Sequence, residues 1–123
     1  MAQRVIIGVE SAAAAEHRAL AVAQRVDRGE VLPEADYFLS FASATQLFHE
    51  LTPARLAILE RLKASGPQSI HGLARSLGRN YSNVYRDVHR LMGHELVVKN
   101  ERGQVCVPWA EVLIRLTLGE AAA

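Results

Sequence analysis

Two short helical segments separated by a tight turn constrain the fold of this chain more than any other feature. Ser69 is a typical helix cap, and the segment after it ends at Gly78, which tolerates the left-handed conformation of a helix end. The next segment runs from about Asn80 to Met92. Three apolar residues share one side of it: Val84, Val88 and Leu91. Because only Gly78 and Arg79 lie between the two segments, they form a helix-turn-helix.

The residues on either side of this motif complete a larger pattern. Thr52-Pro53 is a strong helix start, since threonine caps free backbone N–H groups and proline has none, and Gly66-Pro67 ends that helix. After the motif, Leu96–Lys99 and Gln104–Val107 are β-prone runs joined by a turn that contains Gly103. A hairpin directly after a helix-turn-helix is a wing. The sequence therefore predicts a winged helix-turn-helix.

The first fifty residues predict two strands and two helices. Arg4–Val9 is short and β-branched, as strands are. Ser11–Arg28 is rich in alanine and is followed by Gly29, which favours a helix with a thin apolar stripe. Tyr37–Phe41 is a further extended segment. A short helix over Ala44–Leu51 is expected to begin with a Ser-x-x-Gln capping box.

The end of the chain has two interpretations. Val112–Leu118 places apolar residues at a period of two, which predicts a strand, although Ala110–Leu116 could also form one or two helical turns. A strand at each end of the chain would expose an edge, so we expect Arg4–Val9 and Val112–Leu118 to pair, within one chain or between two.

The predicted fold is α+β and mainly α. It consists of an N-terminal strand-helix extension for dimerisation or partner binding (residues 1–42), a winged helix-turn-helix DNA-binding domain (residues 43–118) and a tail (residues 119–123).

Composition and charge narrow the class of protein. The chain has 123 residues, 50% of them hydrophobic and 22% charged, which fits one globular domain. The net charge is +1, but residues 1–50 carry four basic against seven acidic side chains, whereas residues 51–123 carry ten against six. The basic half coincides with the predicted helix-turn-helix. Because no apolar run is long enough to cross a membrane and a single cysteine excludes an internal disulfide, we expect a cytoplasmic protein.

The helix from Asn80 to Met92 presents a polar face opposite its apolar side. Four side chains on a helical wheel point outward and are candidates for reading DNA bases: Ser82, Asn83, Arg86 and Arg90. Arginine suits guanine and asparagine suits adenine in the major groove. Asp87 lies off that face. Six more residues are candidates for contacting the DNA backbone: Ser69, Arg79, Asn80, His89, Lys99 and Arg102. The alternative is an ordinary polar surface.

Enzyme chemistry is not indicated. None of the five histidines belongs to a His-x-x-x-His pair or has a carboxylate at metal-ligand spacing. Cys106 lies in a predicted wing strand, where a partly buried structural thiol is more typical than a nucleophile. The glycines are spaced as ends of helices and turns, not as a phosphate-binding loop. We therefore expect no catalytic, cofactor-binding or metal-binding residues.

Leu51–Leu118 resembles winged-helix domains of the MarR-like kind, and more narrowly small bacterial and archaeal transcriptional regulators that include antitoxins of toxin–antitoxin pairs. Four stretches carry the resemblance: Leu51-Thr52-Pro53 with Arg55-Leu56, Leu73-Ala74-Arg75 with Leu77-Gly78-Arg79, Asn83-Val84 with Arg86-Asp87-Val88 and Leu91, and Val107-Pro108-Trp109. One position departs from the pattern. A Gly-Leu pair usually ends the reading helix, whereas here Glu95 precedes Leu96, and Gly93 is expected to cap the helix instead.

The resemblance implies an autoregulating repressor that binds double-stranded DNA as a homodimer and acts as an antitoxin, with a cognate toxin as a further partner. Two alternatives stay open: a stand-alone MarR-like repressor, and a winged-helix protein-interaction module that does not bind DNA. We expect the first half of the chain to supply the dimer contacts. The alternative is that Met1–Gly29 only covers a monomeric core.

Overall fold

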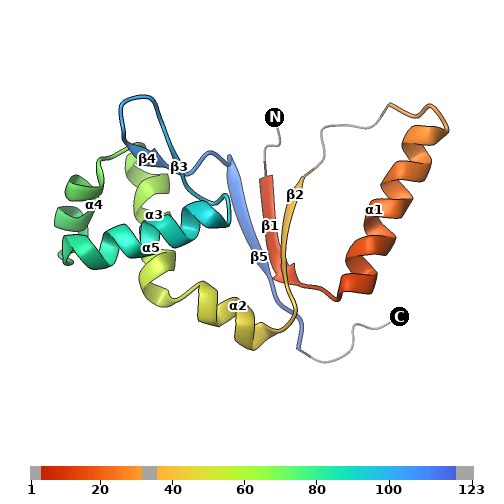
Figure 1. Ribbon diagram of the computed structural model, residues 1–123, viewed down its shortest axis with the longest axis horizontal. Coiled ribbons are helices and arrows are strands. Elements are labelled where there is room, and N and C mark those ends of the chain that lie inside the picture. Colours follow the sequence, from red (N-terminus) through yellow and green to blue (C-terminus); the bar gives the residue numbers. More distant parts are fainter. Residues whose placement is uncertain (1–3, 32–35, 119–123) are drawn as a thin grey trace. The chain divides into compact units, whose positions relative to one another are not determined.

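The computed structural model describes residues 4–31 and 36–118, and the chain divides into two compact units (Figure 1). We call residues 4–31, 36–50 and 109–118 the sheet unit, and residues 51–108 the helical unit. The described residues form five helices, a parallel three-stranded sheet and a small antiparallel hairpin, and about half of the chain is helical. The predicted α+β class is confirmed.

The sheet unit is built on three parallel strands. Its elements in chain order are β1 (Arg4–Val9), α1 (Ala12–Asp27), β2 (Tyr37–Phe41), α2 (Ala44–Glu50) and β5 (Glu111–Arg115). The strand order is β2-β1-β5, and both neighbours run parallel to β1. Ile6 of β1 lies opposite Phe38 of β2 and Leu113 of β5. Since all three strands run the same way, their carboxyl ends meet at one edge of the sheet.

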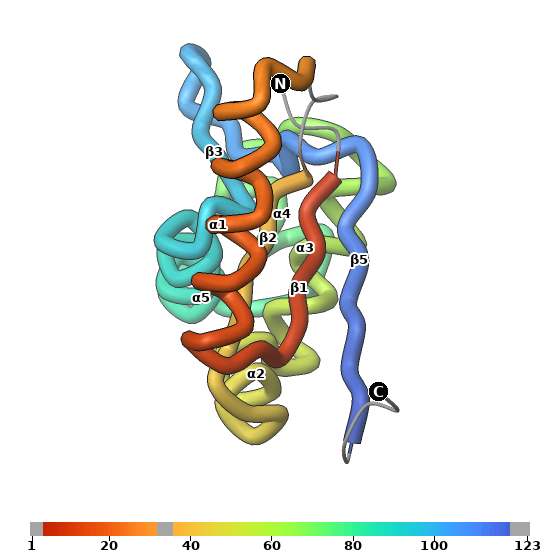
Figure 2. The backbone as a smooth tube through the Cα atoms, turned by 90° about the vertical axis from the view of Figure 1, so that its right-hand side faces the viewer, coloured from red at the N-terminus to blue at the C-terminus, as the bar shows by residue number. Residues whose placement is uncertain are grey.

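The two ends of the chain are joined within this sheet. β1 and β5 pair from Arg4 opposite Glu111 to Gly8 opposite Arg115, and Figure 2 shows them running side by side. The predicted pairing of the terminal strands is therefore confirmed, and it occurs within one chain. The strand interpretation of this segment is also correct, but β5 ends at Arg115 and not at Leu118. In this register Val9, the last residue of β1, would lie opposite Leu116, so residues from Thr117 onward have no partner in β1.

The boundaries of the two units differ from the predicted ranges. The structural division falls after Glu50 and after Pro108, because β5 pairs with β1 in the sheet of the first unit. The functions assigned to residues 1–42 and 43–118 stay predictions.

The helix α1 is well formed but contributes nothing to a core. Its first turn is capped by Ser11, whose Oγ accepts a hydrogen bond from the Ala14 N–H at 3.1 Å. None of its residues is buried, although Arg18 places its guanidinium 4.0 Å from the centre of the Phe38 ring on β2. The core of the sheet unit comes from the strands and α2: Val5, Ile6, Ile7, Phe41 and Leu47 are buried.

The helical unit packs three helices and a hairpin around one apolar core. Its elements are α3 (Pro53–Ser65), α4 (Ile70–Leu77), α5 (Tyr81–Gly93), β3 (Val98–Lys99) and β4 (Val105–Cys106). The predicted Thr52 cap is present, with its Oγ1 accepting from the Arg55 N–H at 3.2 Å, and Gly78 ends α4 at a φ of 63°. The core side chains come from every helix and from the hairpin: Ile58, Leu59, Leu62, Ile70, Leu73, Ala74, Val84, Val88, Leu91, Leu96, Val97 and Val105.

The hairpin is tied to the segment that precedes α4. The Gln68 N–H donates to the Val105 carbonyl at 3.1 Å, and the Val105 N–H donates to the Gln68 carbonyl at 2.7 Å. On its other side β4 pairs with β3. The two strands are shorter than the predicted runs Leu96–Lys99 and Gln104–Val107, and Leu96 and Val97 lie in the core ahead of the ladder.

The end of α5 corrects one expectation. Gly93 lies inside the helix, His94 is the cap, and the next residue, Glu95, adopts the left-handed conformation with a φ of 63°. The Leu96 N–H donates to the Leu91 carbonyl and the Glu95 N–H donates to the Met92 carbonyl, which are the two hydrogen bonds of a Schellman motif. Leu91 and Leu96 are both fully buried, so burial of Leu96 holds the chain in this turn although the left-handed position is occupied by glutamate and not by glycine.

Within the part of the chain that the structure describes, no helix has the length and apolar character needed to cross a membrane.

Candidate nucleic-acid interface

The outward side of α5 carries the residues predicted to read bases. Val84, Val88 and Leu91 have no exposed surface, which fixes the rotation of the helix about its axis. The four candidates on the opposite side are all exposed: Ser82, Asn83, Arg86 and Arg90. The predicted orientation of α5 is therefore confirmed, whereas the contacts of these side chains with bases stay a prediction.

The carboxylate of α5 is neutralised by two arginines. Asp87 accepts a hydrogen bond from the Arg55 Nε at 3.1 Å and another from the Arg79 Nη2 at 2.8 Å. All three side chains are largely buried, with 14% of Asp87, 17% of Arg55 and 27% of Arg79 exposed. This triad ties α3 and the turn before α5 to α5 itself. It also keeps a negative charge away from the outward side of the helix.

Arg79 thus has a structural role that the sequence did not indicate. Its Nη2 is committed to Asp87, and its Nη1 is buried with no hydrogen-bond partner among the described residues. Its predicted contact with the DNA backbone stays a prediction.

Two other backbone candidates act as helix caps. The Ser69 Oγ accepts from the Gly72 N–H at 3.0 Å and starts α4. The Asn80 Oδ1 accepts from the Ser82 N–H at 2.8 Å and starts α5. Both side chains therefore orient the first turns of the two helices, where free backbone N–H groups favour anions such as phosphate.

The tip of the hairpin presents two cations. Lys99 and Arg102 are exposed. The Asn100 Oδ1 accepts from the N–H groups of Arg102 and Gln104, each at 2.9 Å, and Gly103 has a φ of 75°. The turn is therefore held in one conformation by its own side chain, as asparagine commonly does.

A strip of aromatic rings on α4 and α5 was not predicted from the sequence. Ring centres of His71 and Tyr81 are 4.0 Å apart, those of Tyr81 and Tyr85 are 5.9 Å apart, and those of Tyr85 and His89 are 4.0 Å apart. Tyr81 and Tyr85 are 38% and 45% exposed. Together with Ser82, Arg86 and His89, they line a shallow hollow of about 440 Å³. The four-residue spacing of positions 81, 85 and 89 was the available signal.

His89 is held within this strip. It is partly exposed, but its Nε2 is buried and has no hydrogen-bond partner among the described residues. Its predicted backbone contact is untested. Cys106 is partly buried, as expected for a structural thiol. In the described part of the chain, no three His, Cys, Asp or Glu side chains gather in a way that could hold a metal ion.

Fold and site together define a two-unit α+β protein with an exposed, cationic helix face supported by an apolar core. A protein-family model named HVO_A0114 matches residues 50–114, and the chain belongs to this family. No curated protein and no solved structure matches the chain.

Proposed function

We propose that this protein is a sequence-specific DNA-binding transcriptional regulator whose helical unit is a winged helix-turn-helix. The arrangement of α3, α4 and α5, with the α4–α5 turn and the following hairpin, supports this assignment. Gln68 adds a third short segment to the hairpin. Helix α5 is then the recognition helix and the β3–β4 turn is the wing.

The observation that carries the proposal is the chemistry of the outward face of α5. It offers hydroxyl, amide and guanidinium groups, all exposed, and the carboxylate of the helix is bound by Arg55 and Arg79. Such a face can donate to base edges without repelling phosphates. In this mechanism Ser82, Asn83, Arg86 and Arg90 read bases, and Lys99 and Arg102 supply affinity that depends on salt and not on sequence.

The test begins with a search for the preferred sequence. Binding sites are selected from a pool of random duplexes with the full chain, and affinities for the selected site are then measured by titration. Arg86→Ala should weaken binding by about 1–3 kcal/mol per half-site without changing the melting temperature, because its side chain lies outside the core. Arg61→Ala is the matched control, since Arg61 is an exposed arginine of α3 that is not assigned to DNA. Equal affinities of the two variants would exclude α5 as the reading helix.

One observation favours a second candidate function. Exposed tyrosines beside an arginine, as at Tyr81, Tyr85 and Arg86, are also typical of protein interfaces. The alternative is therefore a winged-helix module that binds a protein and not DNA. Retention on immobilised duplex DNA that falls steeply with salt supports the regulator, and absence of retention at low salt supports the interaction module.

The setting we propose is that of an autoregulating, cytoplasmic repressor that acts as a homodimer and as the antitoxin of a toxin–antitoxin pair, without enzymatic activity. A stand-alone repressor is the alternative. Because β1 and β5 already pair within one chain, dimer contacts would have to use other surfaces of the sheet unit. Light scattering of the full chain tests the dimer. A toxin-like product of the adjacent open reading frame that co-purifies with the chain would support the antitoxin role.

A further inference from the structure

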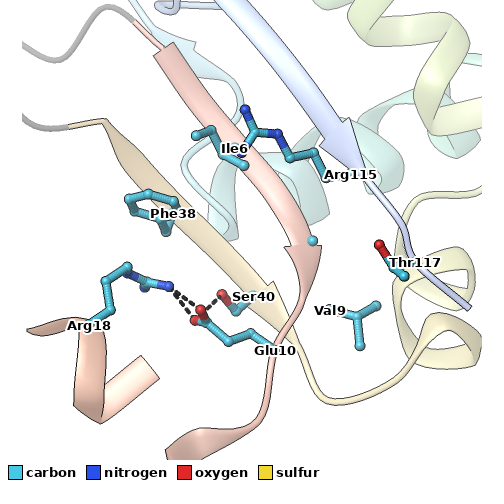
Figure 3. A pocket seen from close by; sticks show the side chains of 9 residues that line it. Ile6, Val9, Glu10, Arg18, Phe38, Ser40, Arg115 and Thr117 are labelled. Atoms are coloured by element: carbon cyan, nitrogen blue, oxygen red, sulfur yellow. Dashed lines mark hydrogen bonds and ion pairs between the residues drawn. The ribbon is translucent and has the colours of Figure 1, made fainter. Parts of the chain in front are cut away.

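We propose that the sheet unit binds a small organic anion, a carboxylate with a short apolar body, at the carboxyl ends of its strands. The site is a pocket of about 220 Å³ (Figure 3). It goes beyond the proposed DNA binding and does not depend on it.

The position of the pocket follows from the topology of the sheet. β1 is the central strand, and the chain leaves it through α1 to reach β2 on one side, whereas β5 lies on the other side. In open parallel sheets, ligands commonly bind outside the carboxyl ends of the strands. Side chains from four separate segments meet there: Glu10, Arg18, Ser40 and Arg115.

The charges that line the pocket favour an anion. Arg18 and Arg115 contribute two positive charges, and Glu10 contributes one negative charge that is already bound by the Arg18 Nη1. Among the described residues, no carboxylate forms an ion pair with Arg115. Asp36, which Arg115 influences electrostatically, is instead hydrogen-bonded to Arg4 at 2.6 Å. The Arg115 guanidinium is therefore the group that a ligand carboxylate would engage.

The remaining lining decides the size and character of the ligand. Ile6, Val9 and Phe38 supply apolar surface, and Ser40 and Thr117 supply hydroxyl groups. The Ser40 Oγ donates to the Glu10 Oε1 at 3.1 Å, so the polar side of the pocket is already ordered. A volume of about 220 Å³ is well above the ~10–15 Å³ that one water molecule needs on the same measure, so a small organic molecule fits. A molecule of this size with one carboxylate and a short hydrocarbon portion matches both surfaces.

Butyrate is a suitable probe, and butyramide is its neutral control. The full chain, labelled with ¹⁵N and free of DNA, is titrated with each compound at constant ionic strength while backbone amide shifts are recorded. We expect saturable shifts for Gly8, Ser40 and Thr117 with butyrate and much smaller ones with butyramide. The amides of Ile58 and Leu59, which are buried in the middle of α3, serve as an internal reference and should not move. This test is independent of the proposed DNA binding. If the chain did not bind DNA, the expected butyrate shifts would be the same.

Two substitutions that should change the butyrate affinity in opposite directions make the test specific. Arg115→Gln should weaken butyrate binding about fivefold or more, and Glu10→Gln should strengthen it by a similar factor, because each changes the charge of the lining by one unit. Arg28→Gln is the matched control, since Arg28 is an exposed arginine beyond the end of α1 and outside the pocket. Arg115→Lys should retain part of the affinity.

Several results would overturn the proposal. These are butyrate shifts that do not saturate at the three pocket amides, equal binding of butyrate and butyramide, and unchanged affinity in Arg115→Gln with a melting temperature equal to that of the wild type. Saturable binding of inorganic phosphate without binding of butyrate would also contradict it, because the apolar lining would then have no role.

Discussion

Helices α1 and α5 have similar signals in the sequence but differ in how much of each helix is buried in the structure. Both are capped at their first turn by a side-chain oxygen, Ser11 in α1 and Asn80 in α5. In α5 the apolar side is completely buried, whereas in α1 no residue is buried, and Val22 and Val26 are 41% and 55% exposed. The two helices therefore share the features that make a helix and differ in what attaches a helix to a core.

The volume of the apolar side chains explains the difference. The stripe of α1 is mainly alanine, which buries little apolar surface, whereas α5 presents valine and leucine to α3 and α4. Since isolated helices are marginal in water, tertiary packing supplies most of the stability of a helix in a protein. Capping and periodicity thus predict where helices form, and side-chain size indicates which of them hold the fold together.

The largest effect on stability is expected when a leucine is replaced by alanine in α5, in contrast to the same replacement in α1. Leu91→Ala in α5 should destabilise the helical unit by about 2–5 kcal/mol, because it leaves a cavity at a fully buried site. Leu20→Ala in α1 should change stability by less than about 0.5 kcal/mol, because this leucine is 57% exposed. Chemical denaturation of the two variants measures both values. A large cost for Leu20→Ala would mean that α1 is covered in solution, for example by a second chain.

A second contrast is between a largely buried and an exposed carboxylate of the helical unit. Asp87→Ala leaves Arg55 and Arg79 without their shared carboxylate and should cost about 2 kcal/mol. Glu101→Ala, in the exposed β3–β4 turn, should cost almost nothing. In the double variant Arg79→Ala/Asp87→Ala the costs should be less than additive, since the two residues form one network. Additive costs, measured by the same denaturation experiment, would show that the triad does not act as a unit.

The sequence was sufficient for the local structure of both units. The bounds of β1 and β2 were predicted without error, because short β-branched or aromatic runs ended at clear turn residues. The exposure of Ser82, Asn83, Arg86 and Arg90 followed from the spacing of three core residues on one helix. These features depend on neighbours within a few positions, where periodicity and capping rules apply.

Most of the features that the sequence did not reveal depend on residues far apart in the chain. Arg55 and Asp87 are 32 positions apart, so nothing in their local surroundings predicted the triad. The pocket of the sheet unit requires the parallel pairing of both chain ends, which left several arrangements open. The left-handed Glu95 was missed because residue preference pointed to Gly93, whereas burial of Leu96 decided the geometry.

A substitution at the left-handed Glu95 should have a smaller effect on stability, and it should stabilise the helical unit. Glu95→Gly should stabilise the helical unit by about 1 kcal/mol, since glycine adopts a φ of 63° without steric cost. Gly103→Ala in the β3–β4 turn, at a φ of 75°, should destabilise the helical unit by a similar amount. Melting temperatures of the two variants should therefore move in opposite directions. A lower melting temperature for Glu95→Gly would show that the Glu95 side chain contributes more than its backbone conformation costs.

The smallest expected effect lies in the sheet unit, in the ion pair between Arg4 and Asp36. The hydrogen bond from the Arg4 Nη2 to the Asp36 Oδ2, at 2.6 Å, lowers the pKa of Asp36 below its ordinary value of 3.8 and raises that of Arg4. A folded pKa below the unfolded one means that the unfolded chain binds protons more readily in acid. The stabilisation is therefore complete above a pH of about 4 and is lost as the pH falls through the lower, folded value.

Thermal melts at about pH 7 and about pH 3 test this contribution. On acidification, the wild type should lose slightly more stability than Asp36→Asn, which has no carboxyl group to protonate at this position. Asp27→Asn, near the end of the exposed helix α1, is the matched control and should follow the wild type. The difference is expected to be small because 39% of the Arg4 and 28% of the Asp36 side chain are in contact with solvent, where water weakens an ion pair. An identical loss in wild type and Asp36→Asn would show that the pair does not stabilise the sheet, so that β1 would be held by its backbone pairing and buried side chains alone.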